Sequence, residues 1–96
     1  MSDVIFLDEQ FFDVLEKLFP EIPQDCIKIL YFMSIGMTYS SIQALSELSE
    51  GKVKHRTEKI MRSLSVSSLL AVREIYHCRL ISYFVNMQIK LDSDYI

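Results

Sequence analysis

Basic side chains are concentrated in one short segment of this chain. Residues 51–62 contain five bases and one acid, a net charge of +4, whereas residues 1–25 contain seven acids and one base, a net charge of −6. The five bases are Lys52, Lys54, Arg56, Lys59 and Arg62, and His55 lies among them. Lysine and arginine neutralise phosphates, and a basic segment on an otherwise acidic body is typical of a nucleic-acid-binding surface. Because the whole chain has a net charge of −3, phosphate contacts should be confined to this segment.

Side chains that could catalyse a reaction or bind a metal are poorly placed for either task. His77 and Cys78 are adjacent, so on a helix they point about 100° apart, and no third or fourth ligand lies near them in the sequence. Asp8 and Glu9 are more simply explained as acidic residues in the first turn of a helix. The sequence has no glycine-rich phosphate loop and no Ser-His-Asp order. We therefore expect no enzyme activity, no cofactor and no metal site.

The two cysteines and the apolar segments bear on the compartment. Cys26 and Cys78 are too few for a disulfide framework, and each lies in an apolar stretch, so we expect buried free thiols and a reducing compartment. No basic residues precede the first apolar stretch, as a signal peptide would require. The apolar C-terminal segment is interrupted by charges such as Arg73 and Arg79, which a spanning helix would not carry. We expect a cytoplasmic protein with no membrane partner.

The elements that position the basic segment are predicted to be helices. The chain has 96 residues, enough for one domain (1–96), with 50% apolar residues and only two glycines and two prolines. A first, acidic helix (within 1–22) should begin after Asp8, which can cap it, and end at Pro20 and Pro23. A second helix is predicted over residues 24–35, ended by Gly36. Its inner side should carry Ile27, Leu30 and Met33 or Ser34.

Two further helices complete a predicted helix-turn-helix over residues 23–66. Thr38 is a suitable N-cap for a third, short helix that holds Ile42. Ser49 is the N-cap of a fourth helix, which carries the basic segment and runs to about Leu64. Val53, Ile60 and Leu64 are spaced by seven and four residues, so they share the inward stripe of this helix.

The last helix is predicted over residues 67–91, capped by Ser65 or Ser67 and about 35 Å long. Apolar side chains occur on two of its faces, and one face is enough to close the core. The other face would be exposed in a monomer, and large exposed apolar patches usually mark interfaces. We therefore expect a homodimer through this helix; the alternative is that the first helix covers the face within the monomer. The expected interface residues are Leu69, Tyr76, Leu80, Phe84 and Met87.

The order of these features resembles the LuxR/GerE-type helix-turn-helix family over residues 24–75. Residues 29–38 resemble its first helix and turn, Ile42 matches the isoleucine of its scaffold helix, and residues 49–56 and 60–66 resemble the two ends of its recognition helix. Members of the family usually have Thr where this chain has Lys52 and Gly where it has Ser65. Larger members carry a receiver or ligand-binding domain before the motif, and we expect none here.

The resemblance implies a bacterial, phage or plasmid transcriptional regulator that binds duplex DNA as a dimer, with the helix 49–64 in the major groove. Two alternatives are a protein that pairs with a larger transcription regulator or RNA polymerase subunit, and a sigma-factor-like fragment. A basic helical run can also be no more than a solvated face. The expected base-edge contacts are Lys52, His55, Arg56 and Lys59. The expected phosphate contacts are Lys54, Arg62, Thr38, Ser40, and the helix N-terminus from Ser49 to Gly51.

Overall fold

The computed structural model describes residues 9–94, and within that range it contains helices and no strand. The α-helices are α1 (Glu9–Leu18), α2 (Ile27–Ser34), α3 (Tyr39–Ser46), α4 (Glu50–Ser63) and α5 (Leu69–Asp94); a short 3-10 helix, η2 (Gln24–Cys26), precedes α2. The all-α class, with five α-helices and a long last one, is therefore confirmed. The expected cap at Asp8 lies outside the described residues.

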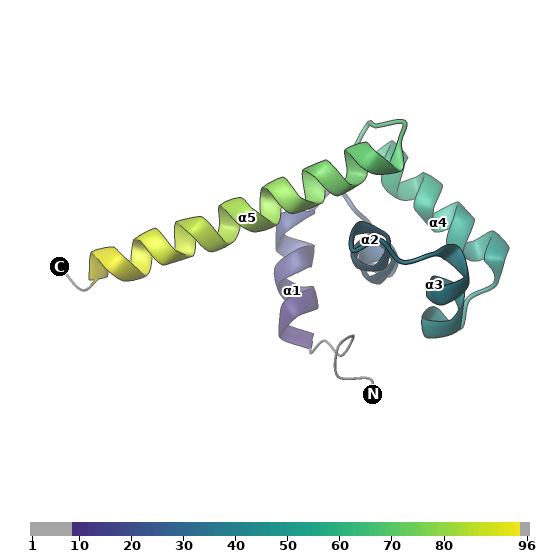
Figure 1. Cartoon of the computed structure of the whole chain (residues 1–96), viewed down its shortest axis with the longest axis horizontal. Helices are drawn as coiled ribbons and strands as arrows, with labels where there is room; N and C mark the ends of the chain where they lie inside the picture. The colour runs from purple at the N-terminus through teal and green to yellow at the C-terminus, as the bar shows by residue number, and fades with distance from the viewer. Residues whose placement is uncertain (1–8, 95–96) are drawn as a thin grey trace.

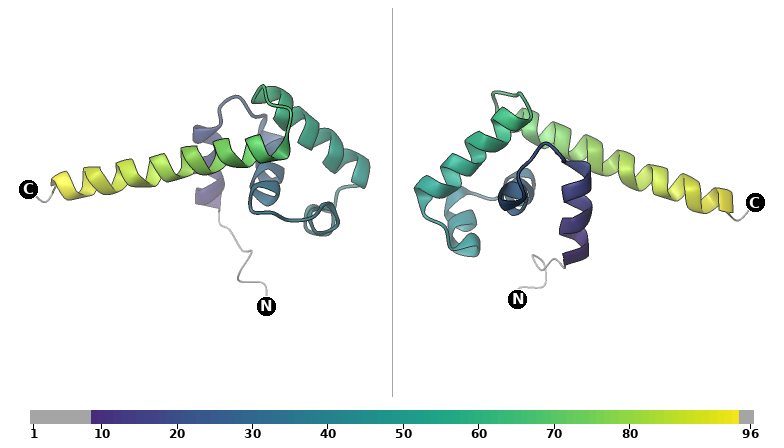
Figure 2. Two further views of the ribbon diagram at one scale, coloured as in Figure 1. Left: turned by 45° about the horizontal axis from the view of Figure 1, so that its top comes forward. Right: turned by 180° about the vertical axis from the view of Figure 1, so that it is seen from behind.

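The short helix α2 forms the centre of the fold. It contacts α1, α3, α4 and α5, and Figures 1 and 2 show the other helices arranged around it. Because α2 has neighbours on several sides, five of its eight residues are buried, including Ile29 in addition to the expected inner side. The second predicted helix began at Gln24, but the chain forms a 3-10 turn over residues 24–26 before α2 begins.

Side-chain and backbone caps set the ends of the short helices, as predicted. The Thr38 hydroxyl accepts a hydrogen bond from the Ser41 amide (3.2 Å), and the Ser49 hydroxyl accepts one from the Lys52 amide (3.3 Å). Gly36 closes α2 with φ of +90°, a conformation that glycine adopts without steric cost. These three residues set where α2 ends and where α3 and α4 begin.

The cap of α5 is a correction to the sequence prediction. The Ser68 hydroxyl, rather than that of Ser65 or Ser67, accepts a hydrogen bond from the Ala71 amide (3.1 Å). Ser65 instead ends α4 in the left-handed conformation, with φ of 57°. Glycine is favoured at such a helix end because it has no Cβ, so the serine here holds a conformation that suits glycine better.

Three of the five residues expected at a dimer interface pack within the monomer. Tyr76 is 1% exposed and stacks on Phe19 with 5.9 Å between ring centroids. Leu69 and Leu80 are half-buried against the same core. These three were expected at the interface because a helical stripe does not show which apolar residues meet the chain's own core. Phe84 and Met87 remain 53% and 43% exposed.

The distal half of α5 (residues 81–93) stands clear of the other helices. Figures 1 and 2 show α5 running past α1 and projecting from the body of the molecule. Its exposed apolar side chains, between 43% and 61% accessible, are Ile81, Phe84, Val85, Met87, Ile89 and Leu91. No helix in residues 9–94 is long and apolar enough to cross a membrane. The first helix does not cover this surface, so that alternative for the apolar face is not what the fold adopts.

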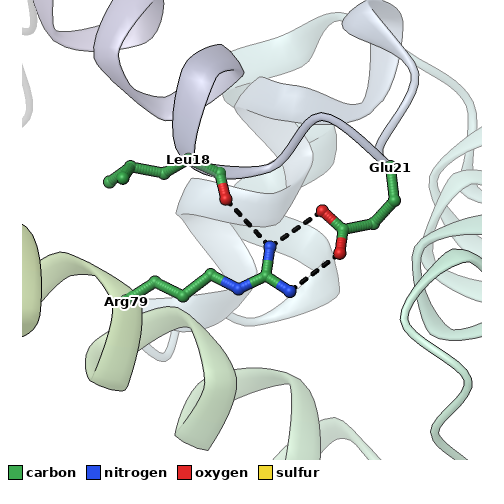
Figure 3. Close-up of polar contacts among 3 residues, drawn as sticks. All are labelled: Leu18, Glu21 and Arg79. Atoms are coloured by element: carbon green, nitrogen blue, oxygen red, sulfur yellow. Dashed lines mark hydrogen bonds and ion pairs between the residues drawn. The ribbon is translucent and has the colours of Figure 1, made fainter.

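A single arginine fastens α5 to the end of α1 (Figure 3). Arg79 donates through Nη1 to the Leu18 carbonyl (2.8 Å) and to the Glu21 carboxylate (2.8 Å), and through Nη2 to the other Glu21 oxygen (2.7 Å). Its guanidinium carbon also lies 4.7 Å from the centroid of the Phe19 ring. We call this cluster the Arg79 clamp. Together with the hydrogen bond from Arg73 Nε to the Met33 carbonyl (3.1 Å) and the buried Val72 and Tyr76, it holds α5 on the body.

The two cysteines have different environments. Cys26 is buried, as expected, and its burial, together with the neighbouring Asp25 carboxylate, raises the pKa of the thiol. Cys78 is exposed on α5, so the prediction that both thiols are buried is wrong for this residue. Its position lies on the side of α5 away from the core, which the apolar character of the surrounding sequence did not reveal.

Candidate nucleic-acid interface

Three residues join α3 to α4. Glu47 takes the left-handed conformation, with φ of 60°, and its amide donates to the Gln43 carbonyl, which ends α3. The Ser46 hydroxyl donates to the Ile42 carbonyl (2.6 Å) and accepts from the Leu48 amide (3.3 Å). The turn is thus held by local hydrogen bonds, and α4 starts in a direction that these bonds set.

The inner side of α4 anchors it to the body. Val53, Thr57 and Ile60 are buried, and the Thr57 hydroxyl is satisfied by donating to the Val53 carbonyl (2.9 Å). Leu64, predicted on the same stripe, is half-buried where the helix ends. With 3.6 residues per turn, the side opposite this stripe carries His55 and Arg62, both of which are exposed.

The basic residues of α4 differ in how free they are. Lys52, Lys54, His55 and Arg62 are exposed, whereas Arg56 and Lys59 are half-buried. Lys52 and Lys54 are two positions apart and therefore lie on opposite flanks of the helix. Glu58 is also exposed and adds one negative charge to the outward surface, so the surface is basic but not uniformly so.

Arg56 contacts the protein itself. Its Nη1 donates to the Asp25 carbonyl (3.0 Å), and its Nη2 lies 4.0 Å from the Asp25 carboxylate. These two residues are 31 positions apart, so no local pattern in the sequence could have indicated the contact. Arg56 therefore ties α4 to η2, and a contact with a base edge would have to compete with this bond.

The four residues predicted to meet base edges come together on one flank of α4. Together with Gly51 and Asp25, they line a shallow hollow of about 320 Å³ beside η2. The basic side chains that line this hollow are Lys52, His55, Arg56 and Lys59. Sequence spacing alone thus groups these four side chains as the structure does, but it gives no sign of Asp25, the one acidic residue in the lining.

The predicted phosphate contacts are distributed over three places. Lys54 lies on the flank away from the hollow, and Arg62 lies in the last turn of α4. Thr38 and Ser40 are exposed at the start of α3, where the Thr38 hydroxyl also donates to that of Ser41 (3.1 Å). Ser49 is exposed at the N-terminus of α4. These groups lie at separate places on α3 and α4 and do not line one pocket.

The candidate interface is argued from the geometry and charge of this chain alone. Comparison of the chain with protein-family models, with curated proteins and with solved structures finds no match.

Proposed function

We propose that this chain is a DNA-binding transcriptional regulator in which α3 and α4 act as a LuxR/GerE-type helix-turn-helix and α4 enters the major groove of duplex DNA. The observation that carries the proposal is the division of α4 into two sides. Val53, Thr57 and Ile60 hold one side in the core, while the other presents exposed bases on a 14-residue helix. A helix of this kind fits the major groove, and its cations neutralise the flanking phosphates.

Gly51 supports the same proposal. A Cβ at this position would meet no atom of the chain within 4 Å, so packing does not require a glycine there. Glycine in a helix is less stable than alanine by about 0.5–1 kcal/mol. A phosphate held close to the free amides of the first turn of α4 would explain the missing side chain. Gly51 therefore fits a close backbone approach by DNA.

The proposal includes a homodimer formed through the distal half of α5. One basic helix on a chain of net charge −3 offers few phosphate contacts, and two copies would double them. Six apolar side chains of this half of α5 are exposed, and such a surface is typical of an interface. Pairing two copies about a two-fold axis would also suit a DNA site with two half-sites. We propose that this regulator acts in the bacterial cytoplasm and is encoded by a bacterium or by its phage or plasmid.

The salt dependence of DNA binding tests the proposal. Fluorescence anisotropy with a labelled duplex of about 25 base pairs should show steep loss of affinity between 50 and 200 mM salt, with a slope of about −0.9 per neutralised phosphate. Lys54→Ala and Arg62→Ala should each lower this slope by about one. Lys17→Ala, which removes the same charge from an exposed position on α1, should leave it unchanged.

Gly51→Ala separates DNA contact from stability. The alanine should leave stability unchanged or raise it by about 0.5 kcal/mol, and yet weaken DNA binding, because its methyl group occupies the space left for the phosphate. No binding to any duplex at 50 mM salt would refute the proposed function. An equal effect of Lys17→Ala and Lys54→Ala on the slope would refute the role of α4.

A second candidate function is favoured by the exposed half of α5. If the chain binds no DNA and sediments as a monomer, this surface would be the docking site for a larger transcription regulator or an RNA polymerase subunit.

A further inference from the structure

A groove separates α1 from the turn that joins α3 to α4. It has a volume of about 620 Å³, and α2 and η2 form its floor. Its apolar lining includes four side chains that are not fully buried, namely Phe12, Phe32, Leu45 and Leu48. Leu45 is exposed although it belongs to α3, whose other apolar residue of the same size, Ile42, is in the core. The groove is therefore an apolar surface that residues 9–93 leave open.

The rim of this groove is acidic. Glu9 and Glu16 contribute carboxylates from α1, and Glu47 contributes one from the turn on the opposite side. Within residues 9–93, no cation lies within ion-pair distance of these three carboxylates. Two cations also line the groove: Lys28, whose ammonium lies 5.3 Å from the centroid of the Phe12 ring, and Arg56, which contacts Asp25. With Asp25 included, the lining has four carboxylates against these two cations. The open groove thus has an excess of negative charge.

We propose that this groove binds a basic amphipathic helix of a partner protein. The apolar side of that helix would pack on Phe12 and Leu45, and its lysines or arginines would meet the carboxylates on both rims. Glu9, Phe12 and Glu16 recur at positions i, i+3 and i+7, so they follow one side of α1 over about 10 Å, or two helical turns. A two-turn contact of apolar anchors flanked by charge is the usual mode of helix recognition in a groove.

The charge of the rim selects against other partners. A nucleic acid or an anionic membrane would bring phosphates against three carboxylates, which repel them. A peptide that binds by strand addition would need a sheet edge to pair with, and the walls of the groove are helices. A basic helix gains both from the apolar lining and from the rim.

The groove and the DNA-facing hollow of α4 are separate sites with a common wall. Asp25 and Arg56 line both the groove and the hollow. The hydrogen bond from Arg56 to the Asp25 carbonyl lies in the wall between these two sites. The partner helix would therefore lie on the far side of this wall from the exposed bases of α4. Binding in the groove does not depend on DNA binding, and each can fail without the other.

A designed peptide tests the charge requirement. The probe is an 18-residue helical peptide with leucines at i, i+3, i+4 and i+7 spacing and lysines elsewhere, labelled for fluorescence anisotropy at 50 mM salt. The double variant Glu16→Gln/Glu47→Gln should weaken its binding to the full chain about fivefold, as expected for two exposed ion pairs. Glu58→Gln/Glu74→Gln changes the net charge equally at exposed positions outside the groove and should leave binding unchanged.

The apolar requirement is tested with single serine variants. Leu45→Ser should weaken binding of the same peptide, whereas Ile81→Ser, on the exposed part of α5, should not. Both leucine and isoleucine are exposed, so both variants should fold, which circular dichroism would verify. The proposal is overturned if the lysine peptide does not bind, if a glutamate version binds as tightly, or if the variants outside the groove weaken binding as much as those inside it.

Discussion

Substitutions that remove the contacts of the Arg79 clamp should lower the free energy of unfolding by a predictable amount. Arg79→Met keeps an unbranched apolar side chain and removes the guanidinium, whereas Glu21→Gln removes the ion pair alone. The guanidinium makes a hydrogen bond to the Leu18 carbonyl, a two-pronged ion pair with Glu21 and a contact with the Phe19 ring. The two variants therefore separate the ion pair from the remaining contacts of Arg79.

The magnitude follows from the exposure of the two side chains. The side chains of Arg79 and Glu21 are 33% and 35% exposed, so solvent screens the ion pair, which should contribute about 0.5–1 kcal/mol. The charged hydrogen bond to the helix-end carbonyl of Leu18 adds about 1.5 kcal/mol, and the contact with Phe19 adds about 0.5 kcal/mol. We expect Arg79→Met to cost about 2–3 kcal/mol and Glu21→Gln at most about 1 kcal/mol.

The pH dependence gives an independent check. The hydrogen bond from Arg79 holds the pKa of Glu21 below its ordinary value of 4.5, although burial opposes the shift. A carboxyl whose pKa is lowered in the folded state stabilises the fold above its unfolded pKa, and this contribution is lost as the pH falls through the folded pKa. The ion pair should therefore stabilise the protein fully at pH 7 and be lost below pH 4.5. Glu21→Gln has no carboxyl at this position, so its free energy of unfolding should fall less between pH 7 and pH 3 than that of the unaltered chain.

Urea unfolding followed by circular dichroism at pH 7, 5 and 3 measures the cost of Arg79→Met, the cost of Glu21→Gln and the loss of the ion pair at low pH. Arg62→Met, at an exposed position of α4, is the matched control and should unfold as the unaltered chain does. A cost below 0.5 kcal/mol for Arg79→Met would refute the clamp, as would an equal cost for the two variants.

Three other predictions follow from single residues. The Ser34 hydroxyl is buried and has no hydrogen-bond partner in the described structure, so Ser34→Ala should raise the free energy of unfolding by about 1 kcal/mol. Glu47 and Ser65 have positive φ, and Glu47→Gly and Ser65→Gly should each stabilise by about 0.5–1 kcal/mol in urea titrations; a loss for either would contradict the backbone conformation described. In the proposed dimer, Ile81→Glu should yield a monomer by sedimentation velocity at micromolar concentration, whereas Ser82→Glu, on the polar side of α5, should not. A monomeric unaltered chain would refute the dimer itself.

Helix ends were predictable where one residue determines the local geometry. Thr38 and Ser49 each cap a helix because their hydroxyls reach an amide three positions on, and Gly36 takes a left-handed conformation that other residues avoid. The start of α5 was not predictable in the same way, because the segment offers three serines with equal local chemistry. The structure uses Ser68, since Ser65 is already taken up in ending α4.

The faces of α5 were harder to predict than its existence. Apolar residues on several sides of a helix do not show which of them meet the chain's own core and which stay exposed. Tyr76 was expected at an interface and is instead the largest fully buried side chain, whereas Cys78, two positions later, is exposed. The deciding information is where α5 leaves the body, and the contacts that hold it there join distant residues: Arg79 meets Glu21, 58 residues away, and Arg73 meets Met33, 40 residues away. Contacts of this separation are not encoded in a local pattern.

The same limit shapes the candidate interface. Sequence spacing grouped Lys52, His55, Arg56 and Lys59 on one flank of α4, as the structure does. It could not show that Asp25 stands at the edge of that flank and binds Arg56. On a protein of net charge −3, an acid at this place reduces the number of free bases facing a phosphate backbone. Any DNA affinity must then depend on the lysine and arginine side chains that Asp25 does not contact, and a single copy of the chain has few of them. The small number of free basic side chains on α4 therefore supports the proposed pairing of two copies through α5, as does the exposed apolar surface of that helix.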